Sequence, residues 1–325
     1  MSIKNDVAAL LEQRRGAAVS GQELADRLGV SRAAVWKAVK QLQEEGYRIS
    51  AGTNRGYILE NETDVLTAEG IRLYLPERYR ENPVEVFRTV SSTNTEAKSA
   101  ALRGMPDGTI IAADGQTAGR GRFGKSFYSP EGTGLYMSVI LKPHKPLSDC
   151  TDITMAAAVA LIESVEKVCG IRAEIKWVND IFYNGRKISG ILTEAISDFE
   201  SGMAETVIVG MGINIRTESF PEEIAGLAGS LGVFAERNRL CAEIASRLLD
   251  YAESGGRAEL LNKYRERSIV PGRDITFLQG EITRSGRALE IDDNGCLVIE
   301  TENGRETLRS GEISVVGGFK ATPHN

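Results

Sequence analysis

Residues 21–40 decide the fold of the N-terminal part of the chain; they read Gly-Gln-Glu-Leu-Ala-Asp-Arg-Leu-Gly-Val-Ser-Arg-Ala-Ala-Val-Trp-Lys-Ala-Val-Lys. Gly29 allows the positive φ that a tight turn between two helices requires, and Ser31 suits the N-cap of the second helix. The pattern predicts a helix-turn-helix. The apolar side chains of its second helix share one face, as expected of a buried stripe: Val35, Ala38, Val39 and Leu42.

The opposite face of this second helix combines cations with an aromatic side chain, which suits the major groove of DNA. A strand over 47–50, a turn over 52–54 and a returning strand over 56–59 would add a wing. An ordinary three-helix packing unit or a protein-interaction module is the alternative. We expect the DNA contacts to come from Ser31, Arg32, Ala33, Trp36, Lys37, Lys40 and Arg55.

Charge is distributed unevenly along the chain. Residues 1–60 hold nine Lys or Arg and seven Asp or Glu, net +2, whereas all 325 residues together carry −6. Because one copy offers few phosphate contacts, specific DNA binding would need a dimer on two half-sites. The negative total argues against a wholly basic nucleic-acid coat or a polybasic membrane binder.

Composition excludes several other classes of protein. Hydrophobic residues make up 42% of the chain, which is enough for a sizeable core. The four cysteines are far apart and there are two histidines, so neither a Cys/His zinc site nor a disulfide framework is expected. The first residues lack the apolar core of a signal peptide, and the longest apolar run, 155–162, is too short to span a membrane. We therefore expect a reduced, cytoplasmic protein.

Hydrophobic periodicity predicts three domains, over residues 1–65, 66–270 and 271–325. The second is expected to be α/β, with Asn184-Gly185 as a hairpin turn. The third should be a small barrel of short strands separated by glycine turns, among them Ser285-Gly286. Strands of the central domain are predicted over 109–113, 135–141, 174–178, 181–183, 188–195 and 206–213. Its helices are predicted over 93–102, 153–168 and 238–267. The strands of the C-terminal domain are predicted over 275–278, 288–291, 297–300 and 313–316.

A glycine-rich loop stands near the start of the central domain, where residues 115–124 read Gly-Gln-Thr-Ala-Gly-Arg-Gly-Arg-Phe-Gly. The spacing satisfies G-x-G-x-x-G, but the residues that follow cannot form the helix of a dinucleotide-binding site. What remains is a loop whose Arg120, Arg122 and Lys125 could grip an anion. A solvated basic loop is the alternative.

Two further runs carry polar groups. Residues 176–180 read Lys-Trp-Val-Asn-Asp and end a strand, where Asn179 and Asp180 could face a metal ion. Lys187, just after the hairpin turn, could reach an anionic group across the sheet. The alternatives are an Asx-turn at Asp180 and a surface cation at Lys187.

Glycines also interrupt a strand at residues 209–214, Val-Gly-Met-Gly-Ile-Asn, which indicates close approach of a ligand or another chain. Asn214 offers an amide for a base edge or a sugar, although a bulge and a packing glycine would explain the run equally. Residues 91–94, Ser-Ser-Thr-Asn, supply hydroxyls at a helix start or simply an N-cap. Together, the anion-gripping loop, the lone lysine, the carboxylate and the neutral polar groups suit nucleotidyl transfer onto a carboxylate.

The ordered set of motifs resembles the biotin–protein ligases. It comprises Ser92-Thr93-Asn94, Gly119-Arg-Gly-Arg-Phe-Gly124, Lys176-Trp-Val-Asn-Asp180, Arg186-Lys-Ile-Ser-Gly-Ile191 and Gly210-Met-Gly-Ile-Asn214. With the winged domain in front, essentially the whole chain resembles the bifunctional biotin ligases and biotin operon repressors of bacteria. The resemblance implies an α+β fold: a winged helix-turn-helix, a central domain of the class II synthetase-like biotin/lipoate ligase type, and an SH3-like C-terminal barrel.

The resemblance also implies a reaction. The biotin carboxylate attacks the α-phosphate of Mg-ATP, and a lysine of an acceptor protein then takes the biotinyl group from the adenylate. The implied catalytic residues are Lys187, Arg120 and Arg122. Biotin would be bound by Ser92, Thr93, Asn94, Gln116, Gly119, Arg120, Gly121, Arg122, Lys187 and Gly190. ATP would be bound by Arg122, Phe127, Asn179, Asp180 and Asn214, with Asp180 facing Mg²⁺.

Partners follow from the same resemblance: a biotin carboxyl carrier protein, operator DNA, and a second copy of the chain when the adenylate is bound. The dimer face would compete with the acceptor face. Two departures stand out, since family members often have Trp where Phe127 stands and Pro where Val178 stands.

Three other functions are weighed against this one. A lipoate ligase would share the catalytic fold but usually lacks both the DNA-binding domain and the arginine loop. A ligand-sensing regulator without ligase activity would not need Lys187, Arg120 and Asp180 together. The third alternative is a protein-interaction adaptor that binds its partner through the barrel, but no feature of residues 271–325 requires that function.

Overall fold

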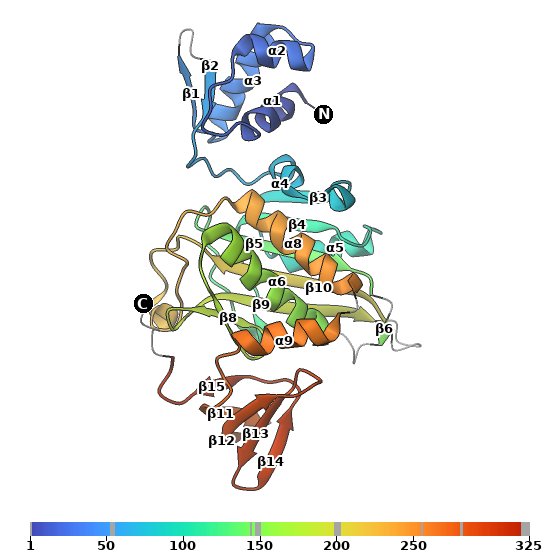
Figure 1. Ribbon diagram of the computed structural model, residues 1–325, viewed down its shortest axis with the longest axis vertical. Helices are drawn as coiled ribbons and strands as arrows, with labels where there is room; N and C mark the ends of the chain where they lie inside the picture. The colour runs from blue at the N-terminus through green and yellow to red at the C-terminus, as the bar shows by residue number, and fades with distance from the viewer. Residues whose placement is uncertain are drawn as a thin grey trace. The chain divides into compact units, whose positions relative to one another are not determined.

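The computed structural model describes residues 2–52, 56–143, 145–146, 151–197, 203–254, 256–279 and 282–319 (Figure 1). The chain divides into two compact units. The first comprises Met1–Glu81 with Phe234–Ala242, and the second comprises Asn82–Val233 with Glu243–Asn325. The described helices include none that is both long and apolar enough to cross a membrane.

The first unit contains the predicted helix-turn-helix. Gly29 ends the first helix of the motif with φ 65°, and the Ser31 hydroxyl caps the second helix by accepting from the Ala34 N–H at 3.2 Å. Both expectations are therefore confirmed. The elements are α1 (Ile3–Glu12), α2 (Gly21–Leu28), α3 (Arg32–Glu44), β1 (Ile49–Gly52), β2 (Gly56–Leu59) and α4 (Ala68–Tyr74).

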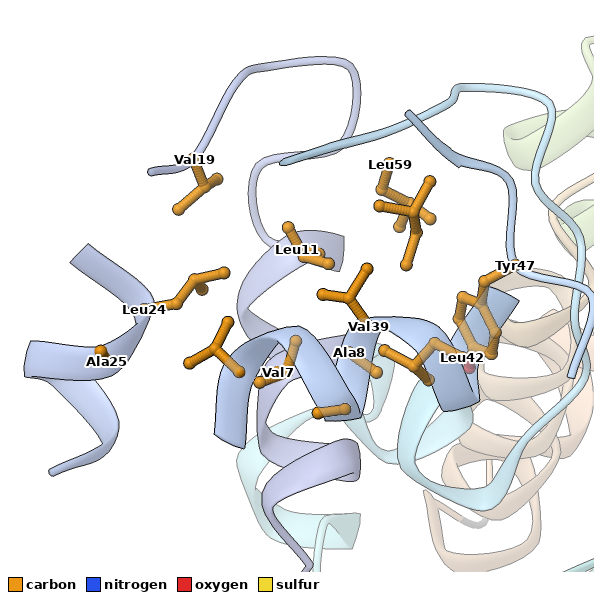
Figure 2. Close-up of a cluster of buried hydrophobic side chains, with 13 residues drawn as sticks. Val7, Ala8, Leu11, Val19, Leu24, Ala25, Val39, Leu42, Tyr47 and Leu59 are labelled. Atoms are coloured by element: carbon orange, nitrogen blue, oxygen red, sulfur yellow. The ribbon is translucent and has the colours of Figure 1, made fainter. Parts of the chain in front are cut away.

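The core of the first unit is apolar. Figure 2 shows Val7 and Leu11 of α1, Leu24 of α2 and Leu42 of α3 directed toward one another. Leu59, at the end of the β1–β2 pair, completes the cluster. The wing begins two residues later than predicted, because β1 starts at Ile49.

A segment far away in the sequence belongs to the first unit because buried polar groups bind it there. Arg237 and Asp64 form an ion pair at 2.8 Å, with each side chain only 5% exposed. Asn238 accepts from the Thr67 N–H at 3.0 Å and donates to the Val65 carbonyl at 2.9 Å. The segment after the wing is thus fixed by residues about 170 positions further on.

The second unit is built on one mixed sheet, in the order β3-β4-β5-β10-β9-β8-β7, with β6 also pairing β10. Only the β3–β4 pair in this described sheet is parallel. The strands are β3 (Val84–Val90), β4 (Ile110–Gln116), β5 (Gly134–Leu141), β6 (Lys145–Pro146), β7 (Glu174–Lys176), β8 (Asp180–Tyr183), β9 (Arg186–Ser197) and β10 (Met203–Asn214). The predicted hairpin is confirmed: Asn184 and Gly185 have φ 49° and 73°, and Tyr183 pairs with Arg186.

Helices pack against both faces of the central sheet. α5 (Thr93–Leu102) packs against Ile111, Ile140 and Ile208 on one face. α6 (Thr151–Cys169) runs across the sheet in Figure 1 and carries Thr154, which bonds to Thr193 of β9 at 2.8 Å. The single helical block predicted over 238–267 is two helices, α8 (Arg237–Ser254) and α9 (Arg257–Arg267), and a short α7 (Glu222–Ala225) precedes them.

The C-terminal part is a five-stranded antiparallel sheet in the order β14-β13-β12-β11-β15. Here the predicted turn at Ser285-Gly286 is wrong. Gly286 lies within β12, where a Cβ atom would stand 2.8 Å from the Glu300 carbonyl oxygen, so the glycine serves close backbone approach. The strands are β11 (Asp274–Gln279), β12 (Ile282–Ile291), β13 (Leu297–Thr301), β14 (Gly304–Leu308) and β15 (Ile313–Val315).

Candidate active site

A cavity of about 380 Å³ lies on the α5 face of the central sheet. It is lined by the start of α5, the end of β4, the arginine loop, and parts of β8, β9 and β10. The loop that contains α7 and the segment before β15 complete the wall. Most of the predicted binding residues line it: Ser92, Thr93, Asn94, Gln116, Arg120, Gly121, Arg122, Phe127, Asn179, Asp180, Lys187, Gly190 and Asn214.

The uncharged wall of the cavity is a hydrogen-bonded network around Gln116. Its Oε1 accepts from the Thr93 N–H at 2.8 Å and the Thr93 hydroxyl at 3.3 Å, and its Nε2 donates to Ser129 at 2.8 Å. Ser92 occupies the N-cap position of α5, but its hydroxyl makes no capping hydrogen bond. The N-cap alternative is therefore correct for the position of Ser92 but not for its hydroxyl, because Gln116 Oε1 instead accepts from the Thr93 N–H at the helix start.

The floor of the cavity is made of glycines on neighbouring strands. Gly190 and Gly212 pair across β9 and β10. A Cβ at Gly212 would lie 2.5 Å from the Phe127 ring, and one at Gly210 would lie 1.9 Å from Asn94 Oδ1. These glycines permit close approach, but the groups that approach are side chains of this chain, so the alternative of a packing glycine is the correct one at both positions.

Gly119 does not line the cavity. A Cβ there would lie 2.4 Å from the Phe127 carbonyl oxygen, so the residue lets the loop pass close to the extended segment that follows it. No α-helix follows the loop: the described residues show a short 3₁₀ turn over Arg122–Gly124 and then extended chain. This confirms that the loop is not a dinucleotide-binding motif.

The two arginines of the loop have different surroundings. Arg122 donates to Asn179 Oδ1 at 3.0 Å and to the Gly311 carbonyl at 3.2 Å, and it forms no salt bridge among the described residues. Burial lowers its pKa from the usual value, although Asp180 and Glu312 oppose the shift. Arg120 instead pairs with Glu194 at 3.2 Å.

Lysines form the remaining cationic wall. Lys187 Nζ lies 2.6 Å from Asp180 Oδ1, and both side chains line the cavity. Asp180 begins β8, so it is not the turn residue of the alternative, and Lys187 is more than a surface cation. Burial lowers the pKa of Lys176, which stands beside Asp180 and over the Phe182 ring at 5.9 Å. Lys125 forms an ion pair with Glu312.

The side-chain amides of Asn179 and Asn214, both predicted to bind ATP, have hydrogen-bond partners within the protein, but the Asn214 oxygen has none in the described part of the chain. Asn179 donates to the Ile191 carbonyl at 2.8 Å while its Oδ1 receives Arg122, so this residue positions Arg122. Asn214 donates to the Gly229 carbonyl at 3.0 Å and is 4% exposed. Its buried Oδ1 has no hydrogen-bond partner among the described groups, which fits a polar ligand atom.

Several lining residues were not singled out from the sequence. Lys176 stood inside a quoted motif, so its charge was available as a signal. Gly311 and Glu312 gave no signal, because their place in the wall depends on how the C-terminal sheet packs. Val178, one of the two departures noted from the resemblance, is held by the Tyr264 hydroxyl, which donates to its carbonyl at 2.9 Å.

The predicted DNA-binding face has the expected exposure. The stripe Val35, Ala38, Val39 and Leu42 is buried, and Trp36 is 56% exposed with Lys40 Nζ 6.0 Å from its ring centre. Arg55 lies outside the described residues. The other predicted contacts on α3 and its cap are all exposed: Ser31, Arg32, Ala33, Lys37 and Lys40.

Known families match the chain in three consecutive stretches. The HTH domain matches residues 4–58, the biotin/lipoate A/B protein ligase family matches 86–214, and the biotin protein ligase C-terminal domain matches 272–316. One match falls in each predicted domain, whose boundaries remain predictions. The class defined here is a ligase domain joined to a helix-turn-helix domain.

Individual relatives narrow this class. The chain is 36% identical to the bifunctional ligase/repressor BirA of Bacillus subtilis over 97% of its own length and 99% of the relative. It is 27% identical to the Escherichia coli BirA over 91% and 92%. The biotin protein ligase from Aquifex aeolicus, solved with biotin and ATP, aligns with a TM-score of 0.61 at 28% identity, covering 72% of this chain and 98% of that chain. The chain therefore belongs to the biotin–protein ligase family, among its bifunctional ligase/repressors.

Proposed function

We propose that the chain activates biotin with ATP to biotinyl-5'-AMP and transfers the biotinyl group to a lysine of a biotin carboxyl carrier protein. One observation carries this proposal. The cavity is lined by five cations, Arg120, Arg122, Lys125, Lys176 and Lys187, against two carboxylates, Asp180 and Glu312, in a chain of net charge −6. Such an excess of fixed cations suits a reaction that brings two anions together.

The two ends of the cavity suit the two ends of biotin. The hydrogen-bonded pair Thr93 and Gln116, together with the neighbouring Ser92 hydroxyl, offers donors and acceptors for the ureido ring, which selects a ring with matching polar atoms. Lys187 and Arg122 would hold the biotin carboxylate and the α-phosphate. The unpartnered Oδ1 of Asn214 would face the nucleotide.

The first step forms a bond between a biotin carboxylate oxygen and the α-phosphorus and breaks the bond from that phosphorus to pyrophosphate. Lys187 and Arg122 stabilise the charge that builds up on the transferring phosphoryl group. In the second step the lysine amine of the acceptor attacks the biotinyl carbonyl carbon. AMP leaves and the amine loses its proton, which completes the amide.

Magnesium would be bound mainly through the phosphates. Mg²⁺ commonly uses one or two carboxylates together with substrate phosphates, and Asp180 fits that role. Among the described residues no cluster of three or more His, Cys, Asp or Glu could hold a metal without substrate. When bound, the ion supplies charge neutralisation at the triphosphate.

We further propose that the winged domain represses biotin genes, with biotinyl-5'-AMP as corepressor and a homodimer as the DNA-binding form. The exposed face of α3 supports this role. Footprinting on an operator fragment tests it: binding should tighten when biotin and Mg-ATP are added. Equal affinity with and without the adenylate would contradict the corepressor role.

The ligase proposal is tested by mixing the chain with Mg-ATP and either biotin or lipoate. Pyrophosphate release and an acyl-adenylate detected by mass spectrometry are expected with biotin, followed by labelling of an added carrier protein. A lipoate-dependent adenylate would point to the lipoate ligases. No adenylate with either acid would leave a ligand-sensing regulator.

A further inference from the structure

Glu194 of β9 connects the arginine loop to the frame of the cavity. Its Oε1 accepts from Lys98 Nζ at 2.6 Å and lies 3.2 Å from Arg120 Nη2, while its Oε2 accepts from Asn94 Nδ2 at 2.8 Å. The side chain is 17% exposed. Three donors, two from α5 and one from the arginine loop, therefore meet on one carboxylate of a central strand.

The donors around Glu194 keep it ionised. Burial alone would raise the pKa of Glu194, but hydrogen bonds from Lys98 and Asn94 hold it below its ordinary value. Asn94 is fixed in turn, because its Oδ1 accepts from the Ser138 hydroxyl at 2.7 Å and has Gly210 directly beneath it. The anion to which Arg120 is bound thus belongs to a rigid part of the sheet.

The contrast with Arg122 separates the roles of the two arginines. Arg122 faces an amide oxygen and a backbone carbonyl, so its charge is available to a ligand anion. Arg120 already has a carboxylate partner. The ion pair between Arg120 and Glu194 links the loop to β9, a strand that frames the cavity.

We propose that Glu194, supported by Lys98, is a positioning residue that tethers the arginine loop through Arg120 and so sets how long the acyl-adenylate stays bound. This inference rests on the proposed function. Arg120 then acts through the loop, and Arg122 is the arginine of the pair that contacts the reacting anions. The tether limits escape of the intermediate before an acceptor lysine arrives.

The test uses the full chain and the variant Glu194→Gln, which keeps the shape and an acceptor for Asn94 but removes the charge. Enzyme loaded with biotinyl-5'-AMP is isolated and chased, and release is timed. We expect release to become about 10-fold faster, the effect of losing about 1.4 kcal/mol of charge-assisted hydrogen bonding. Pyrophosphate exchange at saturating biotin should change less than about 3-fold.

Glu163→Gln is the matched control. Glu163 on α6 also receives three donors, Arg247, Tyr251 and Lys263, at 2.9, 2.8 and 3.1 Å, and it lines no part of the cavity. It should leave adenylate release unchanged. Arg120→Gln breaks the same tether from the loop side, and the double variant with Glu194→Gln should release no faster than either single variant.

Trypsin provides a readout that does not depend on biotin. It cleaves after Arg120, Arg122 and Lys125, so a loosened loop should be cut faster in Glu194→Gln than in the parent or in Glu163→Gln. If the parent enzyme formed no adenylate, the proposed function would fail. The rate of trypsin cleavage would still show whether Glu194 holds the arginine loop. Equal cleavage, equal release, or a loss of exchange of about 100-fold with unchanged release would overturn the tether.

Discussion

The molecule contains two charged clusters that resemble each other in composition and differ in purpose. In the first unit, Arg237 and Asp64 are nearly sealed from solvent, and Arg15 is bound by Glu12 at 2.6 Å and Glu236 at 3.2 Å. In the cavity of the second unit, cations outnumber carboxylates and Arg122 has no ion-pair partner among the described residues. Compensated charge fixes the chain, whereas an excess of one sign creates a binding site.

The largest expected effect lies in the compensated cluster. Arg237→Met would remove the guanidinium that pairs with the buried Asp64 carboxylate, so the free energy of unfolding should fall by about 3–5 kcal/mol. Chemical denaturation followed by fluorescence measures the change. Replacing both partners, Arg237→Met with Asp64→Leu, should recover most of the loss. Equal stability of parent and single variant would show that this pair is not structural.

The next effect lies in the cavity, where cations outnumber carboxylates. Lys187→Ala should lower kcat/KM for biotin-dependent pyrophosphate exchange by about 10²–10³, because a cation at the reacting groups is lost. The thermal midpoint should hardly change. Lys167→Ala is the control, since Lys167 pairs with Glu243 at 2.6 Å and is not among the residues that line the cavity. Full activity in Lys187→Ala would contradict the ligase mechanism.

A smaller effect is expected on the DNA-binding face. Trp36→Ala removes a side chain that is 56% exposed, so it should leave stability and pyrophosphate exchange unchanged. Operator affinity measured by fluorescence anisotropy should fall about 10-fold, in the range for one lost base contact. Unchanged affinity would place DNA contact on another surface or remove it altogether.

The smallest expected effect concerns Lys176, a single cation of the cavity. Burial lowers the pKa of Lys176, which means that its positive charge destabilises the fold. We attribute its presence to the function of a cavity that binds anions. Lys176→Met should raise the thermal midpoint by about 2 °C while raising KM for ATP. A lower midpoint with unchanged KM would show that Lys176 serves packing instead.

Sequence reasoning succeeded where neighbours along the chain decide the structure. The turn at Gly29, the cap at Ser31 and the hairpin at Asn184-Gly185 are local, and each is present as predicted. It failed at Gly286, where a glycine that admits a neighbouring strand was interpreted as a turn. It also missed β3 and β14, which stand at the ends of their sheets.

The same division runs through the cavity. The types of chemical group, Lys187, Asp180 and the arginine loop, were evident from the motifs because residue chemistry and short spacing are local properties. Which groups meet was not evident: Glu194 reaches Arg120 across 74 residues and Arg122 reaches Gly311 across 189. In the first unit, Asn238 likewise reaches Thr67 across 171 residues. Such contacts arise when helices and sheets bury their apolar faces, and that packing, rather than local preference, brings distant charges together.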